Sequence, residues 1–194
     1  MEKVSYALGL SLGNNLLSSG VTILDYTKLA KGIQDVMEQK QPGMSYQEAQ
    51  AVVNDFFQTL QSSTSEKAQS EGKAFLDANG KRDEVITLAS GLQYEIMTKG
   101  TGAIPKASDS VKVHYHGTLI DGNVFDSSVR RGEPATFGVT QVISGWVEAL
   151  QLMPVGSKWK LFIPSDLAYG NQGAGQSISP NSTLIFEVEL LEIV

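Results

Sequence analysis

The chain has 194 residues, of which 41% are hydrophobic and 19% are charged, and its formal net charge is −6. A folded chain of this length buries roughly 70% of its unfolded surface, so we expect one large or two small domains. It has no cysteine, which excludes disulfide frameworks, thiol nucleophiles and cysteine-based metal sites. The 15 Lys and Arg residues are outnumbered by 21 Asp and Glu, so a duplex nucleic-acid partner is not expected.

No stretch of the chain approaches the ~20 consecutive apolar residues of a transmembrane helix, so membrane insertion is not expected. The N-terminal sequence MEKVSYALGLSLGNN has neither a basic region before an unbroken apolar core nor a small-residue cleavage site, which are the marks of a secretory leader. We therefore expect a cytoplasmic protein if Met1 is the natural start, and a periplasmic one if a leader has been removed.

Glycine and proline are distributed unevenly along the chain. Residues 1–84 contain 7 Gly and 1 Pro, whereas residues 85–194 contain 12 Gly and 5 Pro. Because these two residue types interrupt regular structure and mark turns, the first part is predicted to be helical and the second part to be rich in turns.

Two amphipathic helices are predicted at the N-terminus. Apolar residues recur every four positions from Val4 to Leu16, which predicts a helix of about four turns with one apolar face. A second helix is expected to begin after an N-cap at Asp25 and to end near Pro42.

A third helix is predicted to be much longer. Ser45 and Glu48 form a capping box that marks its start. Residues 61–79 are polar nearly all round and rich in helix-forming residues, so a continuous helix as far as about Ala78, roughly 50 Å long, is favoured. The alternative for residues 61–79 is a disordered tether.

The predicted helices have more apolar surface than they can bury among themselves. Three helices over about 60 residues enclose little volume, yet they carry two apolar stripes and the pair Phe56 and Phe57. We therefore expect residues 1–60 to form a dimerisation domain and residues 61–84 to be a helix that connects it to residues 85–194. The alternative is a self-sufficient bundle that caps the second domain.

The second part shows the alternation of half-buried strands. Apolar and polar residues alternate in several short segments, and Pro164 closes one of them. Residues 144–150 are long enough for only two helical turns. One short helix against a curved antiparallel sheet is an α+β arrangement. The predicted strands lie around residues 92–96, 111–119, 158–163 and 184–190.

The two histidines fall on one strand and on the same face of it. Val111, Val113 and Tyr115 would share one face, so His114 and His116 would share the other. An H-x-H pair needs a third ligand to hold a metal, and the spacing supplies none. We therefore expect these histidines on a polar outer face, with no metal site.

Three segments of the second part resemble the FKBP-type peptidyl-prolyl cis–trans isomerases, the macrolide-binding family. They are VHYHGTLIDGNVFDSS (113–128), GEPATFGVTQVISGWVEALQLMPVGSKWKLFIPSDLAYG (132–170) and STLIFEVELLEI (182–193). The first 84 residues resemble the helical dimerisation domain of the bacterial Mip-like members of about 22 kDa. The resemblance implies an N-terminal all-helical dimerisation domain with a long connecting helix, and a C-terminal curved antiparallel β-sheet wrapped on one short helix.

The resemblance also implies the site residues. Tyr115 and Tyr169 would present hydroxyl donors to the substrate, and Asp126 would accept from Tyr115 or bias the twisted amide electrostatically. Trp146 would form the pocket floor, and the backbone amide of Ile143 would donate to a substrate or macrolide carbonyl. The implied substrate-binding residues are Phe125, Phe137, Val142, Ile143, Trp146 and Phe186. Without the resemblance, the apolar residues are as well explained as ordinary core, and Asp126 as a cap for the turn that follows it.

The chemistry implied by the resemblance suits the composition. Rotation about an X–Pro bond faces a barrier of about 18–20 kcal/mol but breaks no bond, so it requires no nucleophile, metal or cofactor. A dry apolar pocket stabilises the twisted amide, which has less charge separation than the planar one. Ala135, Gln141 and Leu167 depart from the pattern of single-domain members, so we expect a more open rim, and the resemblance does not extend to substrate preference or macrolide affinity.

The glycine-rich loop 170–182 lacks the Lys-Ser/Thr and the strand–loop–helix context of a phosphate-binding loop. In the family it overhangs the pocket, so we expect a flap that meets residues flanking the proline. The predicted function is a homodimeric prolyl isomerase that accelerates protein folding and holds unfolded, proline-containing polypeptides, with FK506 or rapamycin expected in the same pocket. The alternative is a binding module or holdase without useful catalysis.

Overall fold

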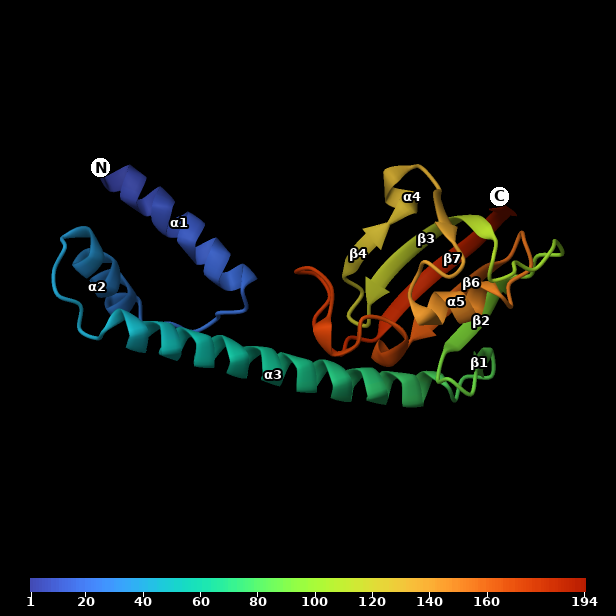
Figure 1. Ribbon diagram of the computed structural model, residues 1–194, viewed down its shortest axis with the longest axis horizontal. Helices are drawn as coiled ribbons and strands as arrows, with labels where there is room; N and C mark the ends of the chain where they lie inside the picture. The colour runs from blue at the N-terminus through green and yellow to red at the C-terminus, as the bar shows by residue number, and fades with distance from the viewer. The chain divides into compact units, whose positions relative to one another are not determined.

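A computed structural model describes residues 1–194 as two compact units, Met1–Leu60 and Gln61–Val194. The first unit contains helices α1 (Glu2–Ser18) and α2 (Tyr26–Met37) together with the first part of α3 (Tyr46–Asn79). The long helix predicted from Ser45 is therefore present as α3 (Figure 1), and the division between the units falls within it. Residues 61–79 belong to the second unit, so the sequence-based boundary near residue 84 stays a prediction.

The N-terminus of α2 is where the sequence places it, whereas its C-terminus is not. Asp25 is the N-cap, and its carboxylate accepts hydrogen bonds from the backbone amides of Thr27 and Lys28 at 2.9 and 3.0 Å. The helix ends at Met37, well before Pro42, because Gln39 adopts a φ of 53° and reverses the chain. A left-handed residue of this kind is a common helix stop, and the sequence-based end near Pro42 was too late.

The first unit leaves most of its apolar side chains exposed. No residue of α1 is buried, and Leu8, Leu10 and Leu17 are 67%, 54% and 62% exposed. The predicted helix is present, and Leu10 and Leu17 are apolar residues that lie outside its predicted face. A groove of about 380 Å³ runs between α1 and α2 and is lined largely by aliphatic residues.

Within the second unit, α3 is not polar all round as the sequence suggested. Ser65, Ala68, Gly72 and the pair Phe75–Leu76 recur at helical spacing and are partly or fully buried, as is Asn79 at the end of the helix. This buried stripe is hard to recognise in the sequence because its first three members, Ser65, Ala68 and Gly72, have small side chains or none and are not strongly apolar. This face of α3 packs against the β-sheet of the same unit.

The sheet of the second unit has seven antiparallel strands in the order β1-β2-β6-β7-β3-β4, with β5 also pairing with β3 (Figure 1). The central strands β6, β7 and β3 form the longest ladders, and the short helix α5 (Ser144–Leu150) lies against them. This is the α+β fold class expected. The strands are β1 (Val85–Thr87), β2 (Gln93–Thr98), β3 (Ser110–Leu119), β4 (Val124–Ser127), β5 (Ala135–Gly138), β6 (Lys158–Ile163) and β7 (Leu184–Ile193).

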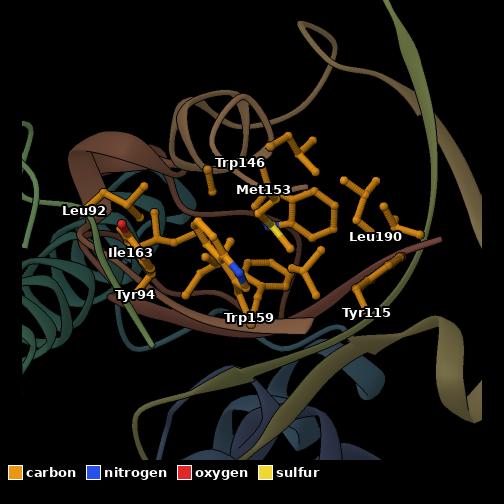
Figure 2. Packing of buried hydrophobic residues seen from close by; sticks show 14 of the residues in the cluster. Leu92, Tyr94, Tyr115, Trp146, Met153, Trp159, Ile163 and Leu190 are labelled. Atoms are coloured by element: carbon orange, nitrogen blue, oxygen red, sulfur yellow. The ribbon is translucent and has the colours of Figure 1, made fainter. Parts of the chain in front are cut away.

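The hydrophobic core fills the space between α5 and the concave face of the sheet (Figure 2). Tyr94 of β2 stacks on Trp159 of β6 with ring centroids 4.3 Å apart, and both side chains are buried. The alternation predicted along β2 fails at Ile96, which is 40% exposed. Gln93 is buried instead, because its side-chain amide donates to the Leu76 carbonyl of α3 at 2.9 Å.

Candidate active site

One pocket of about 690 Å³ opens between α5, β3 and the loop that precedes β7. All nine residues predicted for the site line it. The remaining lining residues are Gln141, Ala174, Gly175, Ser177 and Ile178. Of the three departures from the single-domain pattern, only Gln141 reaches the pocket, whereas Ala135 and Leu167 pack against the core behind it. Ala135 and Leu167 therefore do not contact the pocket, and of the three residues only Gln141 is placed to affect its rim directly.

Trp146 forms the floor of the pocket and is only 4% exposed. It lies in the first turn of α5, where its backbone amide donates to the Ile143 carbonyl at 2.9 Å. Three aromatic rings meet the indole nearly edge-on, at centroid distances of 5.5 Å for Tyr115, 5.9 Å for Phe137 and 5.2 Å for Phe186. Figure 2 shows Trp146 inside the core cluster and Tyr115 at its edge. Edge-on aromatic packing of this kind gives the pocket a rigid apolar base.

Phe125 completes one wall, where it packs edge-on against Phe186 at 5.3 Å. Gly117 of β3 makes this contact possible. A Cβ atom at Gly117 would lie 2.7 Å from the Phe125 ring and 2.8 Å from the Phe186 ring, closer than side chains tolerate. The absence of a side chain at this position therefore allows both rings to cover the strand.

Three polar side chains, those of Tyr115, Asp126 and Arg131, form a group beside the wall made by Phe125. The Tyr115 hydroxyl donates to Asp126 Oδ2 at 2.5 Å, and Arg131 Nη2 donates to the Tyr115 hydroxyl oxygen at 2.8 Å. Arg131 Nη1 also forms an ion pair with Asp126 Oδ1. Each member of this group therefore contacts the other two, which fixes the phenol and the carboxylate relative to the aromatic floor.

The electrostatics of the group keep Tyr115 protonated and Asp126 charged. Burial and then the hydrogen bond to Asp126 raise the pKa of the Tyr115 hydroxyl. Burial alone would raise the pKa of the Asp126 carboxyl, but the hydrogen bonds from Tyr115 and Arg131 outweigh it and lower that pKa. At neutral pH the pocket edge therefore carries a neutral phenol donor beside a carboxylate that is balanced by a guanidinium.

The segment after Phe125 positions this group through two serines. Ser127 caps α4 (Ser128–Arg131) by accepting from the Arg130 amide at 3.1 Å, which places Arg131 beside the pocket. The edge of β3 pairs with β5 up to Val113 and with β4 from His116. Ser128 fills the gap, accepting from the Tyr115 amide at 2.7 Å and donating to the Tyr115 carbonyl at 3.2 Å.

Arg131 and Ser128 were not among the residues predicted from the sequence. Arg131 lies five positions after Asp126, and a basic residue this close in sequence to a site carboxylate was the available signal. Nothing local to Ser128 marks its role, because that role depends on the gap between two strands that both pair with β3. The alternative of Asp126 as a turn cap also has a basis, since its Oδ1 accepts from the Ser127 amide at 2.8 Å.

Tyr169 and Ile143 reach the pocket in a different way. Tyr169 lies between the short 3-10 helices η1 (Ser165–Leu167) and η2 (Gly170–Gln172), and it is 41% exposed, in contrast to the buried Tyr115. Tyr169 is thus a partly exposed member of the pocket lining. Ile143 precedes α5 in an extended conformation, and its carbonyl accepts from the Trp146 and Val147 amides.

The two histidines lie away from the pocket on the other face of β3, as their parity indicates, and both are half-buried. His114 Nδ1 is 3.1 Å from Ser128 Oγ, and His116 Nδ1 is 2.9 Å from Ser127 Oγ. No group of three or more His, Asp or Glu side chains is arranged to hold a metal ion.

The comparisons with known proteins agree with this geometry. Residues 102–191 match the family model for the FKBP-type peptidyl-prolyl cis-trans isomerase, and residues 1–96 match the model for the domain amino terminal to it. The FKBP-type 22 kDa peptidyl-prolyl cis-trans isomerase of Escherichia coli K12 is 48% identical over 195 residues, which cover 99% of this chain and 95% of that protein. The chain belongs to the FKBP-type peptidyl-prolyl cis–trans isomerases. The sequence-based assignment to this family, and with it the isomerase activity, is confirmed.

Two further relatives extend the match over both units. The outer membrane protein MIP of Legionella longbeachae is 46% identical over 99% of this chain and 85% of that protein. The crystal structure of FkpA from Escherichia coli superimposes with a TM-score of 0.78 at 40% identity, covering 98% of the isomerase and 95% of that chain. No helix of the isomerase has the length and apolarity needed to cross a membrane. Because one relative is named as an outer membrane protein, the comparisons give no support to the expected cytoplasmic location.

The charge states of Tyr115 and Asp126 predict a broad pH plateau for the isomerase. The lowered pKa of Asp126 and the raised pKa of Tyr115 keep their hydrogen bond unchanged between about pH 5 and pH 9. The stability that ionised Asp126 contributes is present above about pH 4 and is lost as the pH falls through its lowered folded-state pKa. We expect kcat/KM for a proline peptide to change less than about twofold across the plateau. A step in kcat/KM near pH 6 would contradict this assignment of protonation states.

Proposed function

We propose that the pocket above Trp146 receives the proline ring of the substrate, and that the preceding amide rotates there without any covalent step. The observation that carries the proposal is an apolar, aromatic-walled cavity of about 690 Å³ with Tyr115 and Asp126 on its wall, both bonded to Arg131 beside the pocket. A planar amide has more charge separation than a twisted one, so removal from water destabilises the planar ground state relative to the transition state. The apolar walls supply that difference.

The polar residues of the pocket have distinct roles in this proposal. The backbone amide of Ile143 donates to a carbonyl of the bound peptide, which fixes the chain on one side of the rotating bond. Asp126 orients the Tyr115 hydroxyl and places a negative charge beside the amide, while Arg131 limits that charge. Tyr169, partly exposed in the pocket lining, donates its hydroxyl to the peptide as it enters.

The same pocket is proposed to bind macrolides such as FK506 or rapamycin. Its volume is within the ~300–1,000 Å³ of pockets that enclose drug-sized ligands, and its lining is mostly apolar with a few placed donors. The test is a peptide isomerisation assay with and without rapamycin. We expect acceleration by the isomerase and its loss at saturating macrolide. Acceleration that rapamycin leaves unchanged would place catalysis elsewhere on the chain.

The isomerase is also proposed to act as a homodimer that holds unfolded, proline-containing clients. The first unit buries almost none of its apolar side chains, and its groove between α1 and α2 is lined by Leu12, Leu16 and Ile33, among others. Surface of this kind on a small helical unit is typical of an obligate interface with a second copy of the chain. Two linked pockets then raise the effective concentration of one client at the second site, without any new contact.

A further inference from the structure

Asn181 closes the loop that forms one side of the pocket. Its backbone amide donates to the Gly170 carbonyl at 2.8 Å, so the two ends of the segment Gly170–Asn181 are tied together at its base. Asn181 has a φ of 60°, a left-handed conformation that asparagine adopts more readily than most residues. This conformation is what turns the chain from the loop into the approach to β7.

The body of this loop is held together by its own backbone. Ala174 and Ile178 exchange two hydrogen bonds, at 2.9 and 3.1 Å, in an isolated antiparallel bridge. Gly173 lies so close to this bridge that a Cβ atom there would be 2.3 Å from the Ile178 carbonyl oxygen. Because Ala174 and Ile178 both line the pocket, a shift of the loop base moves part of the pocket wall as one piece.

The side chain of Asn181 connects the loop to α3. Its Nδ2 donates to Ser65 Oγ at 2.8 Å, across 116 positions of sequence. Two residues further on, Thr183 is buried against the same helix. A Cβ atom on Gly72 would lie 2.4 Å from Thr183 Oγ1, so the helix backbone at Gly72 is in direct contact with the residue that precedes β7.

The C-terminal part of α3 contacts the sheet through residues that do not involve the loop. Gln93 of β2 donates to the Leu76 carbonyl and accepts from Asn79 Nδ2, each at 2.9 Å. Phe75 packs against Phe162 of β6 with centroids 5.9 Å apart. The sheet therefore fixes this part of α3, and α3 in turn presents Ser65 to the loop as a fixed acceptor.

We propose that Asn181 is a positioning residue for the isomerase, because it ties the loop that lines the pocket to Ser65 of α3 and so determines where that wall stands over the substrate. The inference rests on the proposed use of the pocket above Trp146 as the substrate site. Loss of the tie leaves Tyr115, Asp126 and Trp146 unchanged, so we expect weaker peptide binding rather than slower rotation once the peptide is bound.

The test uses the full chain with three variants and one control. Ser65→Ala removes the hydroxyl that accepts the hydrogen bond, and alanine is a strong helix former. Asn181→Gly removes the side-chain amide but keeps the backbone amide that bonds Gly170, and glycine adopts the positive φ without strain. The third variant combines the two changes. Ser70→Ala is the matched control, because Ser70 is exposed on α3 and its hydroxyl bonds only the Lys67 carbonyl of the same helix.

Saturation kinetics on a proline tetrapeptide are measured together with hydrogen exchange of the Ala174 and Ile178 amides. We expect Ser65→Ala and Asn181→Gly each to raise KM by about three- to tenfold, with kcat changed less than about twofold, and to speed exchange at both amides. The double variant should match Asn181→Gly alone, since both changes remove one contact. Ser70→Ala should match the wild type.

Different results separate failure of this inference from failure of the pocket assignment. A KM for Ser65→Ala equal to that of Ser70→Ala, or effects of the two single changes that add in the double variant, would overturn the tie to α3. A fall in kcat at constant KM would also overturn it, because that pattern indicates damage to the reacting groups. If rapamycin fails to inhibit the wild-type protein, it is the pocket assignment that fails.

Discussion

Replacing Asp126 with alanine is expected to lower kcat/KM for a proline peptide by about tenfold or more while the sheet remains folded. The carboxylate accepts from the Tyr115 hydroxyl and pairs with Arg131, so its removal leaves that hydroxyl without its acceptor and leaves an unbalanced guanidinium beside the pocket. Hydrogen bonds to charged groups contribute more than neutral ones, although partial exposure of both Asp126 and Arg131 reduces the effect. The measurement is a peptide isomerisation assay on the purified variant.

Two further variants make this result interpretable. Asp121→Ala is the matched control, since Asp121 accepts from the Asn123 amide in an exposed turn away from the pocket, and it should leave kcat/KM unchanged. Asp126→Asn keeps an acceptor for Tyr115 and removes the charge, so it separates orientation of the phenol from the electrostatic effect on the amide. Wild-type kcat/KM in Asp126→Ala would remove Asp126 from the catalytic residues.

The pocket lining could be predicted from sequence because the resemblance covers every segment that supplies one of the predicted residues, and part of the lining is held by local motifs. Phe125 and Asp126 come from one short strand, and Ile143 and Trp146 come from the start of one short helix. Their relative positions are therefore set within a few residues of chain, and a resemblance over those residues carries the geometry with it. The other predicted residues, among them Tyr115, Tyr169 and Phe186, come from separate elements, and only the resemblance to the family indicated that they line the same cavity.

What sequence could not supply depends on contacts between distant segments. Ser128 matters because β4 and β5 leave a gap beside Tyr115, and no pattern near Ser128 records that gap. The buried face of α3 was missed because Ser65, Ala68 and Gly72 look like a solvated helix until the approach of Thr183 is known. Apolar periodicity detects faces that bury large side chains, and it fails where close backbone approach is the reason for burial.

Removing residues 1–60 is expected to convert the isomerase from a dimer into a monomer that keeps peptide activity and loses most of its effect on protein folding. The remaining unit, Gln61–Val194, contains the whole pocket, the full sheet and the part of α3 that packs against it. Light scattering should give twice the 20.9 kDa chain mass for the full protein and the single-chain mass for the shortened one. Peptide kcat/KM should change less than about twofold, because no residue of the first unit lines the pocket.

Point variants of the full chain address the same interface without truncation. Leu12→Asp places a charge in the groove between α1 and α2, where burial against a second copy would be costly, so dissociation at micromolar concentration is expected. Asn54→Asp, on an exposed turn of α3, adds the same charge outside the groove and should leave the dimer intact. The monomeric variants should accelerate refolding of a proline-limited protein less than the dimer does at equal pocket concentration, because each has lost the second linked pocket. A dimer that survives both the deletion and Leu12→Asp would place the interface in the second unit, and equal refolding rates for monomer and dimer would show that a single pocket suffices for a whole client.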